Sequence, residues 1–399
     1  MENLRVSKSD TFFSSKVATI ASHWVCIFLN LTTGIISART LSIEERGTGA
    51  IYVTYTIVVI YFLDLGLTNS ILISQSKLLM PPHARRFRLY LFIIIGTSTG
   101  LVAIGFHLNA HTILTPVVVA SVLFCHGAIV IGRIFNSIES AKTNYSQANI
   151  SRIVQALVFC ILVCTILPRD RTGLNLFFIF TVSWIASTAY ILICSTTFIV
   201  GSASLARPFY KLMFSSFVTS FSAIDGVKLD AIYSSKDPSI SAGVAIINAI
   251  VSVSRSLPTA LMPTLVREMN TNVENGKSRD LDFAQVIFSL GSTLLAIPFA
   301  IFLTPILFGN KYSNLSWPIL VYIVAGSLGV VRIILSELLR AKGKLKFIVV
   351  SESIGFASGL IYMSQNPVAS VKNAALLALI CQTSIVAILT SSFLGRLVK

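Results

Sequence analysis

Three arginines lie inside strongly apolar stretches of this sequence, namely Arg133, Arg255 and Arg332. A charge at the centre of a bilayer costs roughly 2.5–3.5 kcal/mol, so such groups normally face a helix-bundle interior or a wet cavity. The guanidinium fork binds phosphate oxygens through paired N–H donors. We therefore predict that Arg255, the most deeply placed, binds a phosphorylated substrate, supported by Arg133 and Arg332. The alternative for these two is snorkelling to nearby headgroups.

One acidic side chain in an apolar stretch, Asp64, shares a helix face with Tyr61 and Thr68. Burial at that depth would favour the protonated form of its carboxyl group. Asp64 is therefore the predicted site for a coupling ion, either a proton or sodium. The alternative is a structural carboxylate held by a hydroxyl group or an arginine of a neighbouring helix.

Neutral polar side chains form a stripe along the first apolar stretch, where His23 and Asn30 share one face at about 100° per residue. Thr219 belongs to a similar stripe, and Asn248 shares a face with Arg255. We expect such stripes to face protein or water rather than lipid. These four residues are predicted to hydrogen-bond the substrate, although a packing role is the alternative for His23.

The amino-acid composition predicts what kind of secondary structure carries these candidate site residues. The 399 residues are 54% hydrophobic and only 12% charged, against about 25% charged in soluble domains. A membrane span needs about 20 mostly apolar residues, and twelve stretches qualify. We therefore predict an all-α, polytopic membrane protein with about twelve transmembrane helices. The predicted spans are 12–38, 47–73, 89–108, 113–136, 152–168, 174–200, 209–232, 241–265, 284–307, 314–338, 347–363 and 371–393.

The segments between the spans are short, the longest being 74–88, 137–151 and 267–283. None could fold into a catalytic domain, so we predict that the chain is not an enzyme and has no catalytic residues. All six cysteines fall within predicted spans, which disfavours disulfides. The nearest P-loop match places Thr271 where a glycine is needed, and no zinc motif occurs. We expect neither a cofactor nor a bound metal.

The basic residues set the predicted orientation, because Lys and Arg near span ends stay on the cytoplasmic side. With the N-terminus inside, twenty basic residues fall in cytoplasmic segments and seven, including Arg39, Arg46 and Lys311, in outer ones. Both termini are therefore predicted to be cytoplasmic. The formal net charge of +15 thus reflects topology and is no argument for nucleic acid as a partner.

Two weak internal repeats divide the chain. His23 in the first predicted span corresponds to Thr219 in the seventh at an offset of 196 within matching polar stripes. The pattern G-x5-R-I-x2-S begins at Gly127 and again at Gly326, an offset of 199. Two six-helix halves in the same orientation are therefore predicted. The predicted halves are residues 1–200 and 201–399.

Several short stretches also resemble a known family. They are Ala38-Arg39-Thr40-Leu41, Glu44-Glu45-Arg46-Gly47, Asp64-Leu65-Gly66-Leu67, Pro263, Phe308-Gly309-Asn310-Lys311-Tyr312 and Leu339-Arg340-Ala341-Lys342-Gly343-Lys344. They resemble the Wzx-type O-antigen and polysaccharide flippases of the multidrug/oligosaccharidyl-lipid/polysaccharide exporter superfamily. Ser42-Ile43 departs from the Gly-Pro that is common there.

The resemblance implies two six-helix lobes around a central cavity. It also implies translocation of an undecaprenyl-pyrophosphate-linked oligosaccharide from the inner to the outer leaflet of the bacterial cytoplasmic (inner) membrane, in the pathway of lipopolysaccharide or related polysaccharides. The partners would then be this lipid-linked glycan, membrane lipid and a coupling ion. Alternating access of the two lobes would carry the substrate across.

Other functions leave different signatures. A drug or metabolite cation antiporter of the same superfamily would need a carboxylate cluster in the cavity, and the deep base Arg255 argues against cationic cargo. A membrane glycosyltransferase or polymerase would need a large acidic outer loop, which the sequence lacks. A major-facilitator transporter would carry G-x3-D-R/K-x-G-R-R/K in segment 74–88, where it is missing.

Overall fold

The computed structural model describes residues 10–63, 84–141, 145–194, 226–254, 291, 297–298, 300–341 and 344–394. Within these ranges all regular secondary structure is helical, which confirms the predicted all-α class. The N-terminal group of helices is α1 (Asp10–Thr40), α2 (Ile43–Leu63), α4 (Ala84–Leu108), α5 (Pro116–Ala141), α6 (Tyr145–Thr165) and α7 (Gly173–Cys194). The C-terminal group is α9 (Gly226–Ser234), α10 (Pro238–Ser254), a helical stretch over 300–308, η3 (Asn310–Leu315), α13 (Ser316–Ala341), α14 (Leu345–Gln365) and α15 (Val371–Leu394).

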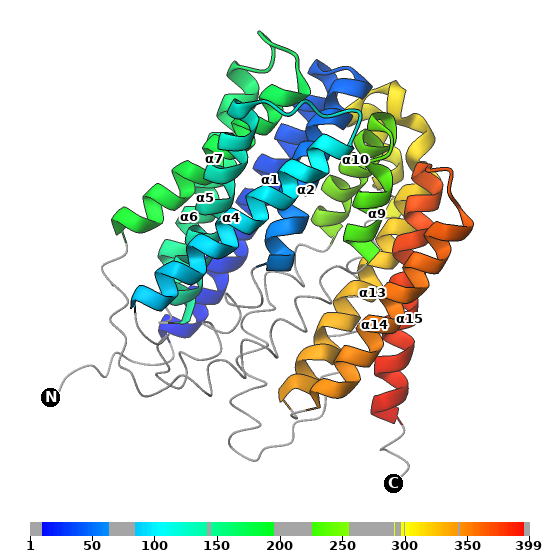
Figure 1. Cartoon of the computed structure of the whole chain (residues 1–399). Helices are drawn as coiled ribbons and strands as arrows, with labels where there is room; N and C mark the ends of the chain where they lie inside the picture. Colours follow the sequence, from blue (N-terminus) through cyan, green and yellow to red (C-terminus); the bar gives the residue numbers. More distant parts are fainter. Residues whose placement is uncertain are drawn as a thin grey trace, which may run out of the picture.

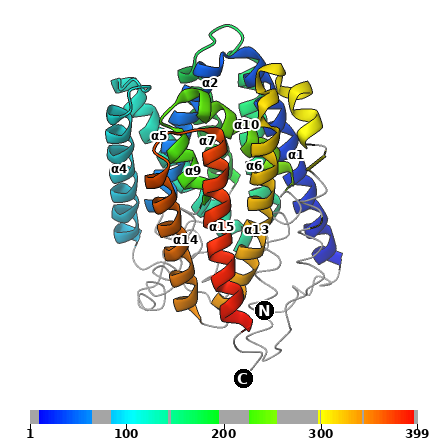
Figure 2. The same cartoon turned by 90° about the vertical axis from the view of Figure 1, so that its right-hand side faces the viewer.

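The two groups stand side by side, as Figures 1 and 2 show. In the N-terminal group α1 packs along α6, α6 along α7, and α7 against both α5 and α2. In the C-terminal group α15 packs against α13, α14 and α9. Helix α1 begins and α15 ends at the lower end of Figure 1, which we call the terminal end; the opposite end is the distal end. The predicted boundary between residues 200 and 201 lies outside the described residues.

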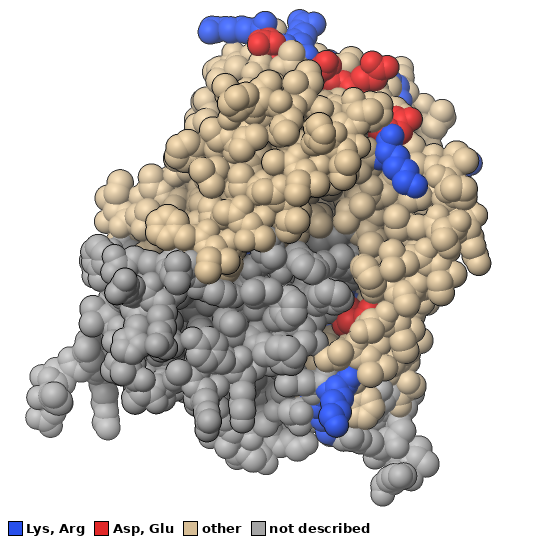
Figure 3. Space-filling model, viewed as in Figure 1, with Lys and Arg blue, Asp and Glu red and all other residues tan. Residues whose placement is uncertain are grey.

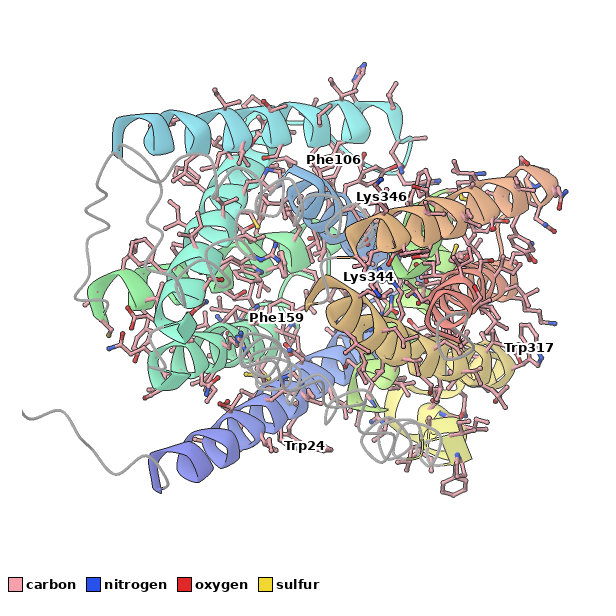
Figure 4. The ribbon with its side chains drawn as sticks, turned by 90° about the horizontal axis from the view of Figure 1, so that it is seen from below. Trp24, Phe106, Phe159, Trp317, Lys344 and Lys346 are labelled. Atoms are coloured by element: carbon pink, nitrogen blue, oxygen red, sulfur yellow. The ribbon has the colours of Figure 1, made fainter. Side chains whose placement is uncertain are left out.

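The helices have the length and surface of membrane spans. Within the described residues, eight helices are long and apolar enough to cross a bilayer, and they carry exposed large apolar side chains such as Phe28, Phe92 and Ile193. In Figure 3 the charged side chains gather mainly at the distal end, above a broad and almost uncharged band. Trp24 and Trp317 project outward at the periphery in Figure 4. These features confirm a polytopic membrane protein.

The predicted stretch between spans over 137–151 is largely helical. The apolar part of α5 ends at Ser137, close to the predicted 136, although the helix continues to Ala141; α6 begins at Tyr145 and its apolar part at Ser146, earlier than the predicted 152. Polar residues at the end of a span do not stop a helix, because the headgroup region lets helical hydrogen bonds continue beyond the apolar core. Five predicted spans extend outside the described residues, so the full number of spans stays a prediction. They are 47–73, 174–200, 209–232, 241–265 and 284–307.

The groups meet most closely where α2 lies against α10. A Cβ atom built on Gly47 of α2 would come within 1.7 Å of the Pro238 carbonyl oxygen at the start of α10. Ala38 of α1 is fully buried among apolar residues of the C-terminal group. Between membrane helices the hydrophobic driving force is absent, and close packing over small residues takes its place. Gly47 therefore fixes how closely the two groups approach.

Gly47→Ala should destabilise the protein by about 1–3 kcal/mol, because the new methyl group overlaps the backbone of α10. The measurement is thermal unfolding of the detergent-solubilised chain. Gly100→Ala is the matched control, since a Cβ atom there meets nothing within 4 Å and should be neutral or stabilise by up to about 1 kcal/mol. Equal unfolding temperatures for the two variants would contradict the close contact.

Candidate substrate site and distal junction

Three of the predicted site residues, Asp64, Thr219 and Arg255, lie outside the described residues. The leading phosphate ligand and the coupling carboxylate therefore remain predictions. The other five, Arg133, Arg332, His23, Asn30 and Asn248, lie on described helices of both groups.

Arg332 on α13 is buried, with only 6% of its surface exposed. Its Nε donates to Oε1 of Glu352 on α14 over 2.6 Å, an ion pair buried inside the C-terminal group. Such a pair holds the guanidinium in place, since in low dielectric a separated charge is strongly disfavoured. A substrate phosphate would have to compete with Glu352 for this arginine.

Arg133 is half-buried on α5, the helix that packs against α7 through the hydrogen bond from Thr188 Oγ1 to the Ala128 carbonyl. On the same helix His126 is fully buried. Its Nδ1 lies 2.9 Å from Ser98 Oγ and its Nε2 lies 3.2 Å from the Thr56 carbonyl oxygen. These bonds bind α5 to α4 and α2, so His126 has a packing role inside the N-terminal group.

The polar stripe of α1 divides between the protein interior and the surface. Thr19, Thr33 and Ser37 are buried, and Thr19 accepts a hydrogen bond from Asn149 of α6. His23 is half-buried, whereas Asn30 is exposed. The buried members show that much of the stripe serves helix packing, and His23 and Asn30 remain as candidates for contact with a substrate.

Asn248 lies on α10, the helix that joins the two groups, and it is half-buried. Its Oδ1 atom is buried without a hydrogen-bond donor in the described part of the chain. An unsatisfied buried amide oxygen of this kind is uncommon and calls for an explanation. A bound polar ligand would provide one.

Sequence reasoning missed the partners of two buried carboxylates. Asp230 on α9 is fully buried, and the hydroxyl group of Tyr322 on α13 donates to its Oδ2. Glu352 on α14 pairs with Arg332 as described above. Both carboxylates fall in predicted spans, so an acidic residue in an apolar stretch was the available signal, but a single sequence does not reveal which helix supplies the partner.

At the distal end, cationic side chains of each group bond to the backbone of the other. Arg39 at the end of α1 donates from Nε to the Leu307 carbonyl (2.9 Å) and from Nη2 to the Ile306 carbonyl (2.6 Å). Lys311 in turn donates from Nζ to the Leu41 carbonyl over 2.8 Å. We call this contact region, together with the packing of Gly47 on α10, the distal junction.

Two further bonds close the same end. Asn109, just after α4, donates from Nδ2 to the Ser235 carbonyl over 3.1 Å. The hydroxyl groups of Tyr55 and Ser235 lie 3.3 Å apart. These five hydrogen bonds between the groups all lie toward the distal end, so the structure is a conformation closed there.

Arg46, near the start of α2, is predicted from the sequence to lie in an outer loop, but it is buried, with 4% of its surface exposed. Its Nη1 donates to the Gly34 carbonyl (2.7 Å) and to Ser37 Oγ (2.6 Å), both on α1. Burial lowers the pKa of Arg46 to about 10, which still leaves the side chain charged at neutral pH. Arg46 is therefore a buried cation beside the distal junction.

Among the described residues no cluster of three or more His, Cys, Asp or Glu side chains could hold a metal ion.

No family model matches the chain, and no curated protein matches its sequence. Solved structures match it over almost its whole length. The lipid II flippase MurJ in an inward closed conformation has a TM-score of 0.71 at 14% sequence identity, covering 96% of this chain and 87% of that one.

Multidrug transporters match as well. An inward-facing multidrug resistance MATE family transporter of the MOP superfamily has a TM-score of 0.57 at 11% identity, covering 96% of this chain and 97% of that one. A mutant of the Vibrio cholerae MATE transporter VcmN has a TM-score of 0.58 at 12% identity, covering 97% of this chain and 96% of that one. The chain thus shares its fold with these transporters and with the lipid II flippase.

Arg332→Gln should destabilise the protein by about 3–5 kcal/mol, because it leaves the Glu352 carboxylate buried without its cation. The double variant Arg332→Met with Glu352→Leu should recover most of this loss, since removing both charges also removes the desolvation penalty. Thermal unfolding in detergent measures both effects. A double variant as unstable as the single one would contradict the ion pair as the source of the loss.

Proposed function

We propose that this chain is a flippase that moves an undecaprenyl-pyrophosphate-linked oligosaccharide, the repeat unit of O-antigen or a related polysaccharide, from the inner to the outer leaflet of the bacterial cytoplasmic membrane. The observation that carries the proposal is the fold shared with a lipid II flippase over 96% of the chain. The sequence resemblance to Wzx-type flippases supports the same class of substrate.

The pyrophosphate would be held by arginines in the apolar region, with Arg255 leading and Arg133 and Arg332 in support, because guanidinium groups pair with phosphate oxygens. The residues that would hydrogen-bond the sugars are His23, Asn30, Thr219 and Asn248. The buried amide oxygen of Asn248, which lacks a donor among the described residues, supports this role. Asp64 would carry the coupling ion, a proton or sodium.

Cations at the terminal end fit the entry of an anionic headgroup. Lys344 and Lys346, at the start of α14, lie near the centre of the view from that end in Figure 4, between the two groups. The excess of basic residues in segments assigned to this end favours a cytoplasmic position. A pyrophosphate entering from the inner leaflet would meet these ammonium groups first.

Transport would proceed by alternating access of lobes 1–200 and 201–399. The described contacts close the distal end, so the present conformation would admit substrate from the terminal side. Passage to the outer leaflet would require the hydrogen bonds of Arg39 and Lys311 to break. Those bonds end on backbone carbonyl groups that water can satisfy once the lobes part.

A second candidate function is a drug or metabolite cation antiporter of the same superfamily. The similarity to MATE transporters over 96–97% of the chain favours it. A cation-binding cavity would need unpaired carboxylates, whereas the carboxylates of Asp230 and Glu352 are held inside the C-terminal group by Tyr322 and Arg332. Lipid-linked glycan is therefore the preferred substrate.

Arg255→Gln should lower surface polysaccharide at least about tenfold, because one charge-assisted bond to phosphate contributes about 1.5–3 kcal/mol. The assay is complementation of a deletion strain, with undecaprenyl-linked repeat units and surface polysaccharide both measured at matched expression. Arg169→Gln, which removes an exposed arginine from the loop after α6, is the control and should behave like wild type.

Wild-type polysaccharide from the Arg255→Gln chain would remove the leading phosphate ligand. A deletion strain that exports polysaccharide normally but gains sensitivity to cationic drugs would instead favour the antiporter.

A further inference from the structure

Arg46 is a buried cation whose charge is not balanced by a carboxylate. No described acidic group lies within ion-pair distance of it, and the neighbouring Glu45 directs its Oε2 to the backbone N–H of Gly173. The Nε atom of Arg46 is buried without a hydrogen-bond acceptor. Buried charges are normally paired, because their desolvation is strongly unfavourable. The bonds of Nη1 to α1 hold the side chain in place, but they leave its charge unbalanced and its Nε without an acceptor.

A second cation and a hydroxyl group approach Arg46 from the C-terminal group. Lys311 donates from Nζ to the carbonyl of Leu41, five residues before Arg46, over 2.8 Å, and its Nζ lies 5.4 Å from the centre of the Tyr312 ring. Burial and the positive charge of Arg46 both lower the pKa of Lys311. Tyr312 is 4% exposed, interacts electrostatically with Arg46, and has a buried hydroxyl group without a hydrogen-bond partner. Two cations and an unpartnered hydroxyl thus meet across the junction.

The chemistry of this set matches a phosphate group. Like charges facing each other across a closing contact oppose closure, and a phosphate group with a charge of about −1.5 to −2 would neutralise both. Guanidinium supplies a planar fork of donors, ammonium a compact charge and phenol a neutral donor, all of which phosphate oxygens accept.

We propose that Arg46, Lys311 and Tyr312 form a second phosphate site at the distal junction, which binds a phosphate or pyrophosphate group when the two helix groups part. The proposal rests on the proposed function for its place in transport, where it would receive the substrate headgroup on the outer side. Ser37 and the Gly34 carbonyl keep Arg46 anchored to α1 while Lys311 leaves the Leu41 carbonyl. The Lys311 ammonium group, which binds a backbone carbonyl group in the closed state, is then free to bind the ligand.

The test measures binding of two probes, inorganic pyrophosphate and farnesyl pyrophosphate, to the full chain in lipid nanodiscs. Arg255→Gln is the starting background, so that the remaining binding reports on sites other than the predicted central one. In this background Arg46→Gln and Lys311→Gln should each weaken probe binding about tenfold or more. Arg46→Lys should recover part of the loss, and Tyr312→Phe should weaken binding less than either charge removal.

Arg39→Gln is the matched control, because Arg39 is a cation of the same junction that bonds only to backbone carbonyls of the other group. If Arg46 merely closed the junction, Arg39→Gln and Arg46→Gln would change binding alike. The proposal expects Arg39→Gln to keep wild-type binding or to strengthen it, since it loosens the closed state. Equal weakening by the two variants, or unchanged binding in Arg46→Gln, overturns the proposal.

The two probes distinguish the sources of the phosphate. Binding of farnesyl pyrophosphate that depends on Arg46 identifies a headgroup carried by a lipid, and such binding of inorganic pyrophosphate alone identifies a free anion; both support the site. If Arg255→Gln abolishes polysaccharide export while Arg46→Gln leaves probe binding intact, the proposed phosphate site at the distal junction is wrong and the proposed flippase function is unaffected. If the wild-type chain binds neither probe, both proposals fail.

A cross-link supplies an independent readout. Asn109→Cys with Ser235→Cys, in a chain whose six native cysteines are replaced, can be joined by a short bifunctional maleimide, since Asn109 Nδ2 and the Ser235 carbonyl oxygen lie 3.1 Å apart. Joining the two positions holds the junction closed and should abolish the Arg46-dependent binding. If Arg46-dependent binding survives complete cross-linking, the site does not need the two helix groups to separate, and that part of the proposal is wrong.

Discussion

The close contact of α2 with α10 is the constraint on which the rest of this structure depends. In a bilayer, apolar helices gain nothing from leaving water, so two helix groups adhere only through close packing and hydrogen bonds. Gly47 permits that packing by letting the Pro238 backbone approach, and Arg39 and Lys311 add bonds to backbone carbonyls at the same end. Within the described residues the contacts between the groups centre on this helix pair, on Ala38 of α1 and on the hydrogen bonds of the distal end.

Three arginines of the described chain are held in different ways, and the differences separate packing from ligand binding. Arg332 has a carboxylate partner inside its own helix group, whereas Arg39 bonds to carbonyl groups across the junction. Arg46 is buried with neither a carboxylate nor an acceptor at Nε. Only the last arrangement leaves both charge and donor capacity unused in the closed state, which is the property that a transient anion site requires.

Sequence periodicity predicted the helical class and most spans well, because about twenty apolar residues in a row have few alternatives. It predicted polar stripes that the structure finds buried at Thr33 and Ser37. It did not predict that Arg46 is buried or that Tyr322 donates to Asp230, 92 residues away. Hydropathy describes one helix at a time, and such pairs depend on which helices pack together. The predicted ligands Arg255, Thr219 and Asp64 lie outside the described residues, so their convergence in one cavity stays a prediction.

The nature of the distal bonds explains how a junction can hold and still open. Five hydrogen bonds at about 0.5–1.5 kcal/mol net each are comparable with the roughly 5.5 kcal/mol that inverts a two-state equilibrium from 1:99 to 99:1. Because Arg39 and Lys311 donate to carbonyl groups, water or phosphate can replace each partner as the lobes part. Opening therefore exchanges hydrogen bonds rather than losing them, and a ligand that binds only the open arrangement can shift the population. Repulsion between the cations Arg46 and Lys311, which acts beside burial on the Lys311 ammonium group, would favour opening as well.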